Sequence, residues 1–231
     1  MNGTLQTLQS LTLYVLPVLF AITLHEAAHA YVAKACGDRT ASMLGRVSLN
    51  PIKHIDPFGT ILLPGLLFLS SNGLFVFGYA KPVPVNFRAL RHPRLDMMLV
   101  AIAGPAMNIL LCCIAMALWH TLSYLPEAAQ RWAAGNIRVA VYLNLILAVF
   151  NLLPIPPLDG GRILMGILPE PLARQVAKLE PQGMVILLVF LFVMPLLGQL
   201  VHRDFNLLQP VIFDAAELLK EPLAALLRFP L

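Results

Sequence analysis

Four long apolar runs, each bounded by polar or charged residues, dominate the pattern of this chain. They cover about residues 7–35, 95–119, 137–153 and 184–201. A helix needs roughly 20 mostly apolar residues to cross a bilayer, so each run qualifies or nearly qualifies as a transmembrane helix. A fifth run, residues 58–69, is shorter and is interrupted by Pro64 and Gly65. We predict a re-entrant or interfacial segment there, surrounded by protein.

Two further segments have patterns of their own. Residues 74–87 alternate and are rich in β-prone residues around Gly78, which predicts a small β-hairpin or edge strand. Residues 202–231 mix apolar with charged residues, which predicts an interfacial amphipathic helix between Pro210 and Pro222. The predicted fold class is therefore an α-helical polytopic membrane protein with about four transmembrane helices, a re-entrant or interfacial segment and a small β-hairpin.

Composition agrees with the bilayer as solvent. The 231 residues are 58% hydrophobic and only 12% charged, whereas a soluble domain is about 25% charged. The mean hydropathy is +0.77. The few basic residues flank apolar runs, so we expect the lipid bilayer as a partner and no nucleic acid. Cys36, Cys112 and Cys113 cannot form a closed disulfide framework, and we expect free thiols.

Basic residues predict the orientation. Eight lysines and arginines lie from residue 34 to residue 94, but only Arg131 and Arg138 lie between the second run and the first residues of the third. Because cytoplasmic loops are enriched in Lys and Arg, the first of these regions should be cytoplasmic and the N-terminus outside. The ends of the first and third spans then both face the cytoplasm, provided that residues 58–69 do not cross the membrane.

The first apolar run contains His25-Glu26-Ala27-Ala28-His29, an H-E-x-x-H sequence. Residues at i and i+4 share one face of a helix, so both imidazoles can reach one metal ion. Glu26 lies about 100° around the helix from His25, where its carboxylate can take a proton from water at the metal. Ionisable residues at membrane depth are costly, and three within five positions favour a metal site over simple hydrogen bonding between helices.

A catalytic zinc site needs a third protein ligand. Asp159 follows the third span in a segment with three prolines that closes with Gly160-Gly161. We expect the prolines to end the helix and the glycines to allow positive φ and close approach, so that Asp159 projects from irregular backbone. Asp56, which precedes Pro57, is the rival ligand, although an Asp before Pro also shapes turns.

These motifs together resemble the site-2 protease family of intramembrane metalloproteases. The resemblance covers about residues 11–168 and is carried by HEAAH at 25–29, NLLPIPPLDGG at 151–161, GDRTA at 37–41, GRVSLNPIKHIDPFGT at 45–60, GYAKPVPVN at 78–86 and AGPAMN at 103–108. It implies one zinc ion per chain, held by His25, His29 and Asp159, with Glu26 as the general base. It also suggests that Asn151 binds substrate or stabilises the oxyanion, with Asn108, Gly160 and Gly161 in supporting positions.

The resemblance also implies a substrate class and a location. We expect hydrolysis of a peptide bond within or near the transmembrane helix of a single-span protein, such as an anti-sigma factor, a membrane-tethered transcription regulator or a signal-peptide remnant. The location implied is a bacterial inner or cell membrane, with the active site toward the cytoplasm. Many relatives carry a PDZ domain or paired cystathionine-β-synthase-type domains. No segment here fits either, so we expect a single domain over 1–231, with 169–231 forming a C-terminal span and an amphipathic tail.

Several alternatives stay open at this point. Residues 74–87 could receive an unwound substrate by strand addition or could be a purely structural hairpin. Asn108 and Asn151 could serve only interhelical hydrogen bonding. A non-enzymatic membrane protein that binds or transports a metal ion could use the same ligands. A membrane-anchored zincin with an exposed catalytic domain would need a polar domain, which the sequence lacks, and an inactive homologue would have no need for the full ligand set.

Overall fold

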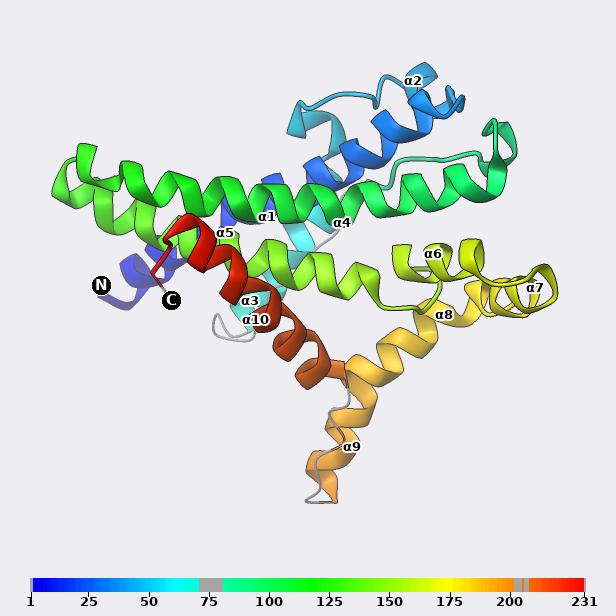
Figure 1. Cartoon of the computed structure of the whole chain (residues 1–231). Helices are drawn as coiled ribbons and strands as arrows, with labels where there is room; N and C mark the ends of the chain where they lie inside the picture. The colour runs from blue at the N-terminus through cyan, green and yellow to red at the C-terminus, as the bar shows by residue number, and fades with distance from the viewer. Residues whose placement is uncertain (1, 71–80, 202–204, 206–207, 231) are drawn as a thin grey trace.

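The computed structural model describes residues 2–70, 81–201, 205 and 208–230. All regular elements in this part of the chain are helical (Figure 1). The α-helices are α1 (Asn2–Ala35), α2 (Thr40–Met43), α3 (Leu63–Ser70), α4 (Pro93–Leu118), α5 (Glu127–Leu152), α6 (Asp159–Ile167), α7 (Glu170–Ala177), α8 (Glu180–Leu188), α9 (Met194–Leu200) and α10 (Leu208–Leu227). Short 3-10 helices are η1 (Pro51–His54), η3 (Phe87–Ala89) and η4 (Trp119–Tyr124), and π-helical turns are η2 (Pro57–Leu62) and η5 (Val189–Val193).

Three long helices, α1, α4 and α5, form the centre of the molecule. In Figure 1, α1 and α5 run in the same direction, and α4, which contacts both, runs in the opposite direction. The C-terminal ends of α1 and α5 therefore lie at one end of the bundle. Met116 of α4 and Leu145 of α5 are fully buried in the main hydrophobic core. This arrangement places the H-E-x-x-H sequence of α1 near the segment that follows α5.

The prediction of four membrane-crossing helices is confirmed by length and composition. Candidate spans cover Thr12–Ala35, Pro93–Tyr124, Ala129–Leu152 and Glu180–Gly198. The last of these runs through α8, η5 and α9 as one apolar path. The chain therefore has the helices of an integral membrane protein.

The region between α1 and α4 differs from expectation in two ways. No strand is present among the described residues, so the predicted β-hairpin is unsupported: 81–86 has no ladder partner, and 74–80 lies outside the described residues. Residues 57–70 form continuous helical structure, η2 followed by α3, so Pro64 and Gly65 do not break it. The re-entrant placement of this segment stays a prediction.

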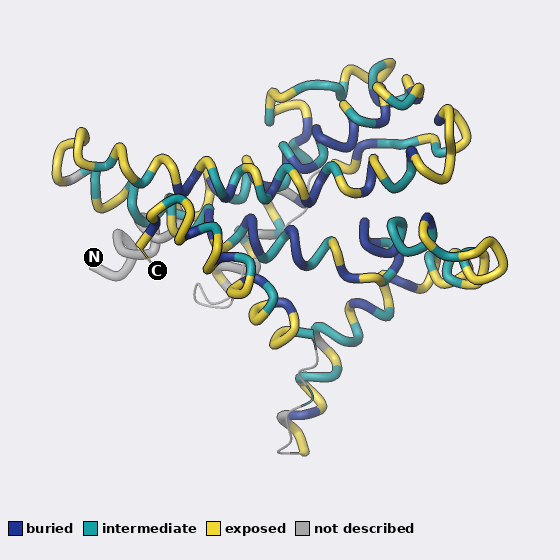
Figure 2. Tube along the Cα trace, viewed as in Figure 1, coloured by how far each residue is buried: buried dark blue, intermediate teal, exposed yellow. Residues whose placement is uncertain are grey.

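The C-terminal tail is one long helix, α10, that packs on α5 and α4. It was expected to run from Pro210 to Pro222, but it begins at Leu208 and continues through Pro222 to Leu227. Its buried face includes Lys220, whose ammonium donates a hydrogen bond to the Tyr142 hydroxyl at 2.7 Å. Figure 2 shows buried positions along α10 where it faces the bundle, so this helix is docked onto the bundle along one face.

Candidate metal centre

Three side chains from α1 and α6 converge at one end of the bundle. The Nε2 atoms of His25 and His29 lie 3.0 Å apart, and each lies 3.3 Å from Asp159 Oδ2. All three residues are buried. With zinc bonds of 2.0–2.1 Å, tetrahedral geometry separates two ligand atoms by about 3.3–3.4 Å. The observed spacing therefore suits three ligands around one small cation.

Hydrogen bonds on the far side of each imidazole fix which nitrogen faces this point. His29 Nδ1 lies 2.7 Å from the Val100 carbonyl oxygen, which can only accept, so Nδ1 carries the proton. His25 Nδ1 lies 2.6 Å from the Asn108 side-chain oxygen and donates in the same way. Both Nε2 lone pairs then face the Asp159 carboxylate, whose Oδ2 has no hydrogen-bond donor among the described residues. Three buried acceptors without a donor repel one another unless a cation lies between them.

The chain reaches Asp159 through a compact proline-rich turn. After α5 ends, residues 153–158 form an irregular link that contains a cis peptide bond between Pro156 and Pro157. Asp159 is itself the first residue of α6, so it projects from a helix start and not from irregular backbone as expected. Gly160 is helical and does not use positive φ. It is needed because a Cβ there would lie 2.2 Å from the Leu152 carbonyl oxygen.

Gly104 of α4 forms the wall against which the two imidazoles lie. A Cβ at this position would lie 2.4 Å from His29 Nε2 and 2.5 Å from His25 Cε1. The helix can approach the ligands this closely only because residue 104 has no side chain. The sequence showed Gly104 only as part of the AGPAMN segment, because its role depends on a packing contact between α1 and α4.

Glu26 is held beside this centre by residues 83–86, a segment that lies between α3 and α4 in the sequence. Its Oε2 accepts a hydrogen bond of 2.8 Å from the Val83 backbone N–H. The same segment is tied to the end of α1 through Asp38, whose Oδ2 accepts from the Asn86 N–H at 2.7 Å. Burial raises the pKa of Asp38, but hydrogen bonds from Thr40 and from the Asn86 N–H outweigh burial, so the pKa lies below its usual value. Residues 83–86 are therefore fixed along the face of α1 that carries Glu26.

The sequence of this chain is similar to those of known peptidases. A sequence profile of peptidase family M50 matches residues 13–131 and 126–196, which together cover most of the chain. This chain belongs to peptidase family M50. This is the site-2 protease family, so the resemblance seen in the motifs is confirmed, and the M50 chain is a zinc metalloendopeptidase by family.

Relatives of this M50 peptidase are named as candidate zinc metalloproteases. YwhC of Bacillus subtilis is 43% identical over 188 residues, which is 79% of this chain and 80% of the relative. Rip2 of Mycobacterium tuberculosis is 33% identical over 180 residues, covering 78% of this chain and 66% of Rip2. Rip2 of Mycolicibacterium smegmatis is 31% identical over 173 residues, covering 75% and 64%. The chain thus spans about two thirds of the mycobacterial relatives. No solved structure shows a significant match.

Of the remaining candidate residues of the M50 peptidase, Asn108 contacts a histidine of the centre, whereas Asp56 and Asn151 make other contacts. Asp56 does not join the histidines. Its carboxylate caps η2 by accepting from the N–H groups of Phe58 and Gly59. Asn151 is half-buried, and its amide donates to the Leu147 carbonyl of its own helix at 3.0 Å, so its predicted role with substrate stays a prediction. Asn108 does contact the centre, as the partner of His25.

Arg162 of this M50 peptidase was not singled out by the sequence analysis. One of its guanidinium nitrogens lies 4.0 Å from Asp159 Oδ1, the carboxylate oxygen that faces away from the imidazoles, and another lies 3.9 Å from Glu180 at the start of α8. The guanidinium also lies over the Phe87 ring, 5.1 Å from its centre. Its positive charge therefore lies between the carboxylates of Asp159 and Glu180. The (i, i+3) spacing from Asp159 was the only available signal.

Proposed function

We propose that this M50 peptidase hydrolyses a peptide bond within or near the transmembrane helix of a single-span membrane protein, with one zinc ion per chain held by His25, His29 and Asp159. The observation that carries the proposal is the convergence of three buried acceptor atoms, two of them on imidazoles that Val100 and Asn108 hold in place. The two nitrogens and one oxygen are the donor set of a catalytic zinc site, which keeps a fourth position open.

In such a site, zinc supplies a Lewis acid that polarises the scissile carbonyl and lowers the pKa of a water molecule to about 7. Glu26 accepts the proton of that water as general base. Its Oε2 is fixed by the Val83 N–H, and its Oε1 makes no hydrogen bond with a described residue, which leaves Oε1 for the proton. Glu26 then delivers the proton to the leaving amine. In this proposal Asn151 stabilises the negative charge on the carbonyl oxygen.

The substrate helix must unwind before its carbonyl can be attacked, because helical carbonyls already accept hydrogen bonds. We propose that the extended segment at 81–86 receives the unwound strand by strand addition. The hydrogen bond from the Val83 N–H to Glu26 supports this, because it holds the segment beside the proposed base. Substituting Pro82 and Pro84 by alanine should then change the cleavage rate or site, and unaltered cleavage by both variants would leave the segment a structural role.

The proposed location is a bacterial inner membrane with the N-terminus outside and the active site toward the cytoplasm. The apolar helices and the family support a membrane location. The excess of basic residues between 34 and 94 supports the orientation. Candidate substrates are anti-sigma factors, membrane-tethered transcription regulators and signal-peptide remnants. Accessibility of cysteines introduced at Ser42 and Glu127 to a membrane-impermeant thiol reagent tests the orientation: the reagent should label Glu127→Cys and not Ser42→Cys in intact cells.

The function is tested with purified protein in detergent and a generic single-span substrate. Wild type should bind about one zinc per chain and cleave. Glu26→Gln should keep the zinc and lose about 10²–10⁴-fold in rate, as expected for a lost general base. The matched control is Glu170→Gln, because Glu170 is exposed on α7 and is paired with the exposed Arg174. Equal cleavage by Glu26→Gln and wild type would contradict the base assignment, and zinc binding without cleavage of any single-span substrate would favour a metal-binding or transport protein.

A further inference from the structure

A chain of two buried amides leads from the middle of α5 to His25. Asn144 Oδ1 accepts a hydrogen bond of 2.9 Å from Asn108 Nδ2, and Asn108 Oδ1 accepts one of 2.6 Å from His25 Nδ1. Asn108 is 0% exposed and Asn144 is 3% exposed. We propose that Asn144 is a positioning residue for the metal centre, which sets the tautomer of His25 through Asn108. This inference rests on the proposed zinc function.

The direction of the chain is set by two backbone carbonyls. Asn144 Nδ2 donates to the Ala140 carbonyl at 2.8 Å, and a carbonyl oxygen can only accept. The Asn144 amide must therefore turn its own oxygen toward Asn108. Asn108 Nδ2 also donates to the Ala21 carbonyl at 3.2 Å. Both Asn108 donors are then used, so its oxygen faces His25 and His25 Nδ1 must carry the proton.

The consequence reaches the ligand atom itself. If the Asn108 amide turned over, its NH₂ group would face His25 Nδ1, and the proton would move to Nε2. A protonated Nε2 has no lone pair for a metal ion. Removal of hydrogen-bond partners behind a metal ligand typically lowers metal affinity by about 10–100-fold. Asn144 thus acts on the centre without touching it.

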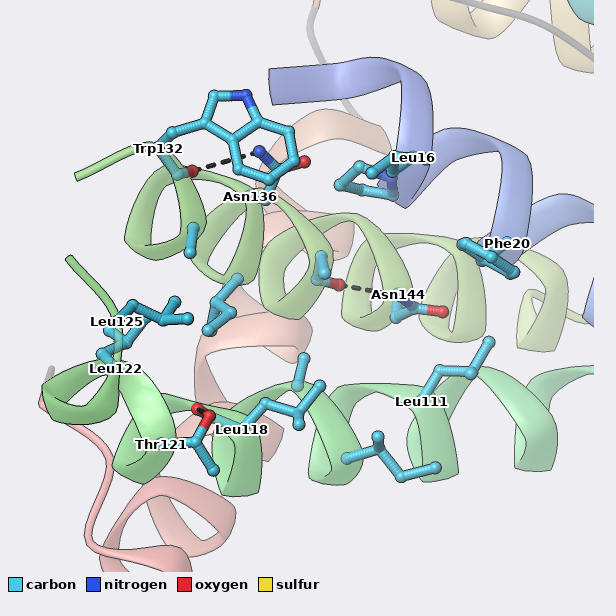
Figure 3. Close-up of a pocket in the computed structure, with 16 residues that line it drawn as sticks. Leu16, Phe20, Leu111, Leu118, Thr121, Leu122, Leu125, Trp132, Asn136 and Asn144 are labelled. Atoms are coloured by element: carbon cyan, nitrogen blue, oxygen red, sulfur yellow. Dashed lines mark hydrogen bonds between the residues drawn. The ribbon is translucent and has the colours of Figure 1, made fainter. Parts of the chain in front are cut away.

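The cavity beside Asn144 is lined mainly by apolar side chains. Asn144 lies at the edge of a cavity of about 410 Å³ between α1, α4 and α5. Figure 3 shows Phe20 and Leu111 as its labelled neighbours there, and both are apolar. An apolar environment strengthens the bond that is made and raises the cost of losing it. Without the Asn144 amide, the Asn108 NH₂ group keeps one of its two acceptors in the described structure, the Ala21 carbonyl.

The same helix supplies a matched control. Asn136 lies two turns before Asn144, lines the same cavity and donates to the carbonyl four residues earlier, that of Trp132, at 3.1 Å. Figure 3 shows the two back-bonded amides on one helix. No described hydrogen bond joins Asn136 to Asn108. Asn136→Leu therefore reproduces the change in helix and cavity without breaking the chain to His25.

The first test measures zinc affinity by competition with a chelator. Asn144→Leu and Asn144→Ser should weaken zinc binding by about 10–100-fold, while Asn136→Leu should match wild type. Asn144→Ser keeps a hydroxyl that can bond to Ala140 but cannot reach Asn108, and it covers the case in which the leucine variant fails to fold. Melting temperatures of the metal-free proteins separate a loss of zinc from a loss of fold.

The second test is independent of zinc. Nitrogen-15 NMR of histidine in the metal-free protein, at alkaline pH, should show His25 protonated at Nδ1 in wild type and Asn136→Leu, and a mixture of tautomers in the Asn144 variants. A wild-type His25 protonated at Nε2, wild-type zinc affinity in both Asn144 variants, or equal weakening by Asn136→Leu would each overturn the inference. A wild type that shows the Nδ1 tautomer but binds no zinc would contradict the proposed function alone.

Discussion

The close contact between Gly104 and the two imidazoles makes a sharp prediction about Gly104→Ala. The added methyl group would lie 2.4 Å from His29 Nε2 and 2.5 Å from His25 Cε1. Ordinary contact begins at about 3.4 Å, so an imidazole or the α4 backbone must move by about 1 Å. Neither ring is free to swing away, because His25 is hydrogen-bonded to Asn108 and His29 to Val100.

The expected result is a large loss of zinc affinity. Zinc sites tolerate deviations of about 0.2 Å in ligand distance, and a shift of about 1 Å exceeds this several-fold. We expect zinc binding to weaken by at least about 100-fold. Overpacking also lowers the free energy of unfolding by about 1–3 kcal/mol, so circular dichroism must show that the variant is helical before its affinity is compared.

The assay is chelator competition in detergent on wild type, Gly104→Ala and Gly65→Ala. Gly65 is the matched control, since it also lies in a helix but a Cβ there meets nothing within 4 Å. Gly65→Ala should bind zinc as wild type does. Wild-type zinc affinity in a folded Gly104→Ala protein would refute the packing of α4 against the metal ligands.

Three further predictions concern stability. Asp38→Asn should lower the free energy of unfolding near neutral pH by about 1–3 kcal/mol. Because folding lowers the pKa of Asp38, its stabilisation is complete above the unfolded value of about 3.9 and is lost as pH falls further, so the variant and wild type should converge in acid when melting is followed against pH. Gly160→Ala would place a methyl group against the Leu152 backbone carbonyl and should lower both the melting temperature and the zinc content. An unchanged melting curve would show that the turn relaxes to accept the methyl group. Tyr142→Phe removes the hydroxyl that accepts from Lys220 and should cost about 1 kcal/mol with zinc affinity unchanged, so a change in zinc affinity would contradict a purely structural role for this hydrogen bond.

The three proposed metal ligands could be named from the sequence because their signal is local or strongly constrained. His25 and His29 are one helical turn apart, and any helix places them on one face. Asp159 was identifiable from the high cost of a carboxylate at the end of a membrane span. The structure brings these three side chains together and has Asp56 capping η2, which favours Asp159 over Asp56 as the third ligand.

Features that depend on contacts between helices were missed. Gly104 and Asn144 have no local pattern that marks them, because their roles exist only when α4 packs between α1 and α5. The irregular backbone expected at Asp159 was wrong for a related reason. The proline-rich segment follows the end of α5, but it is short, and α6 already begins at Asp159. Alternation at 74–87 predicted a hairpin, but the described part is bonded to the side chains of Glu26 and Asp38 and has no strand partner.

The central claim, a centre of two imidazoles and one carboxylate, is tested most directly by zinc X-ray absorption spectroscopy on wild type and Asp159→Asn. The account predicts a wild-type shell of nitrogen and oxygen only, at about 2.0–2.2 Å, with the multiple-scattering signature of two imidazoles, and a large loss of bound zinc in Asp159→Asn. A sulfur neighbour at about 2.3 Å, a third imidazole, or full zinc occupancy in Asp159→Asn would contradict it.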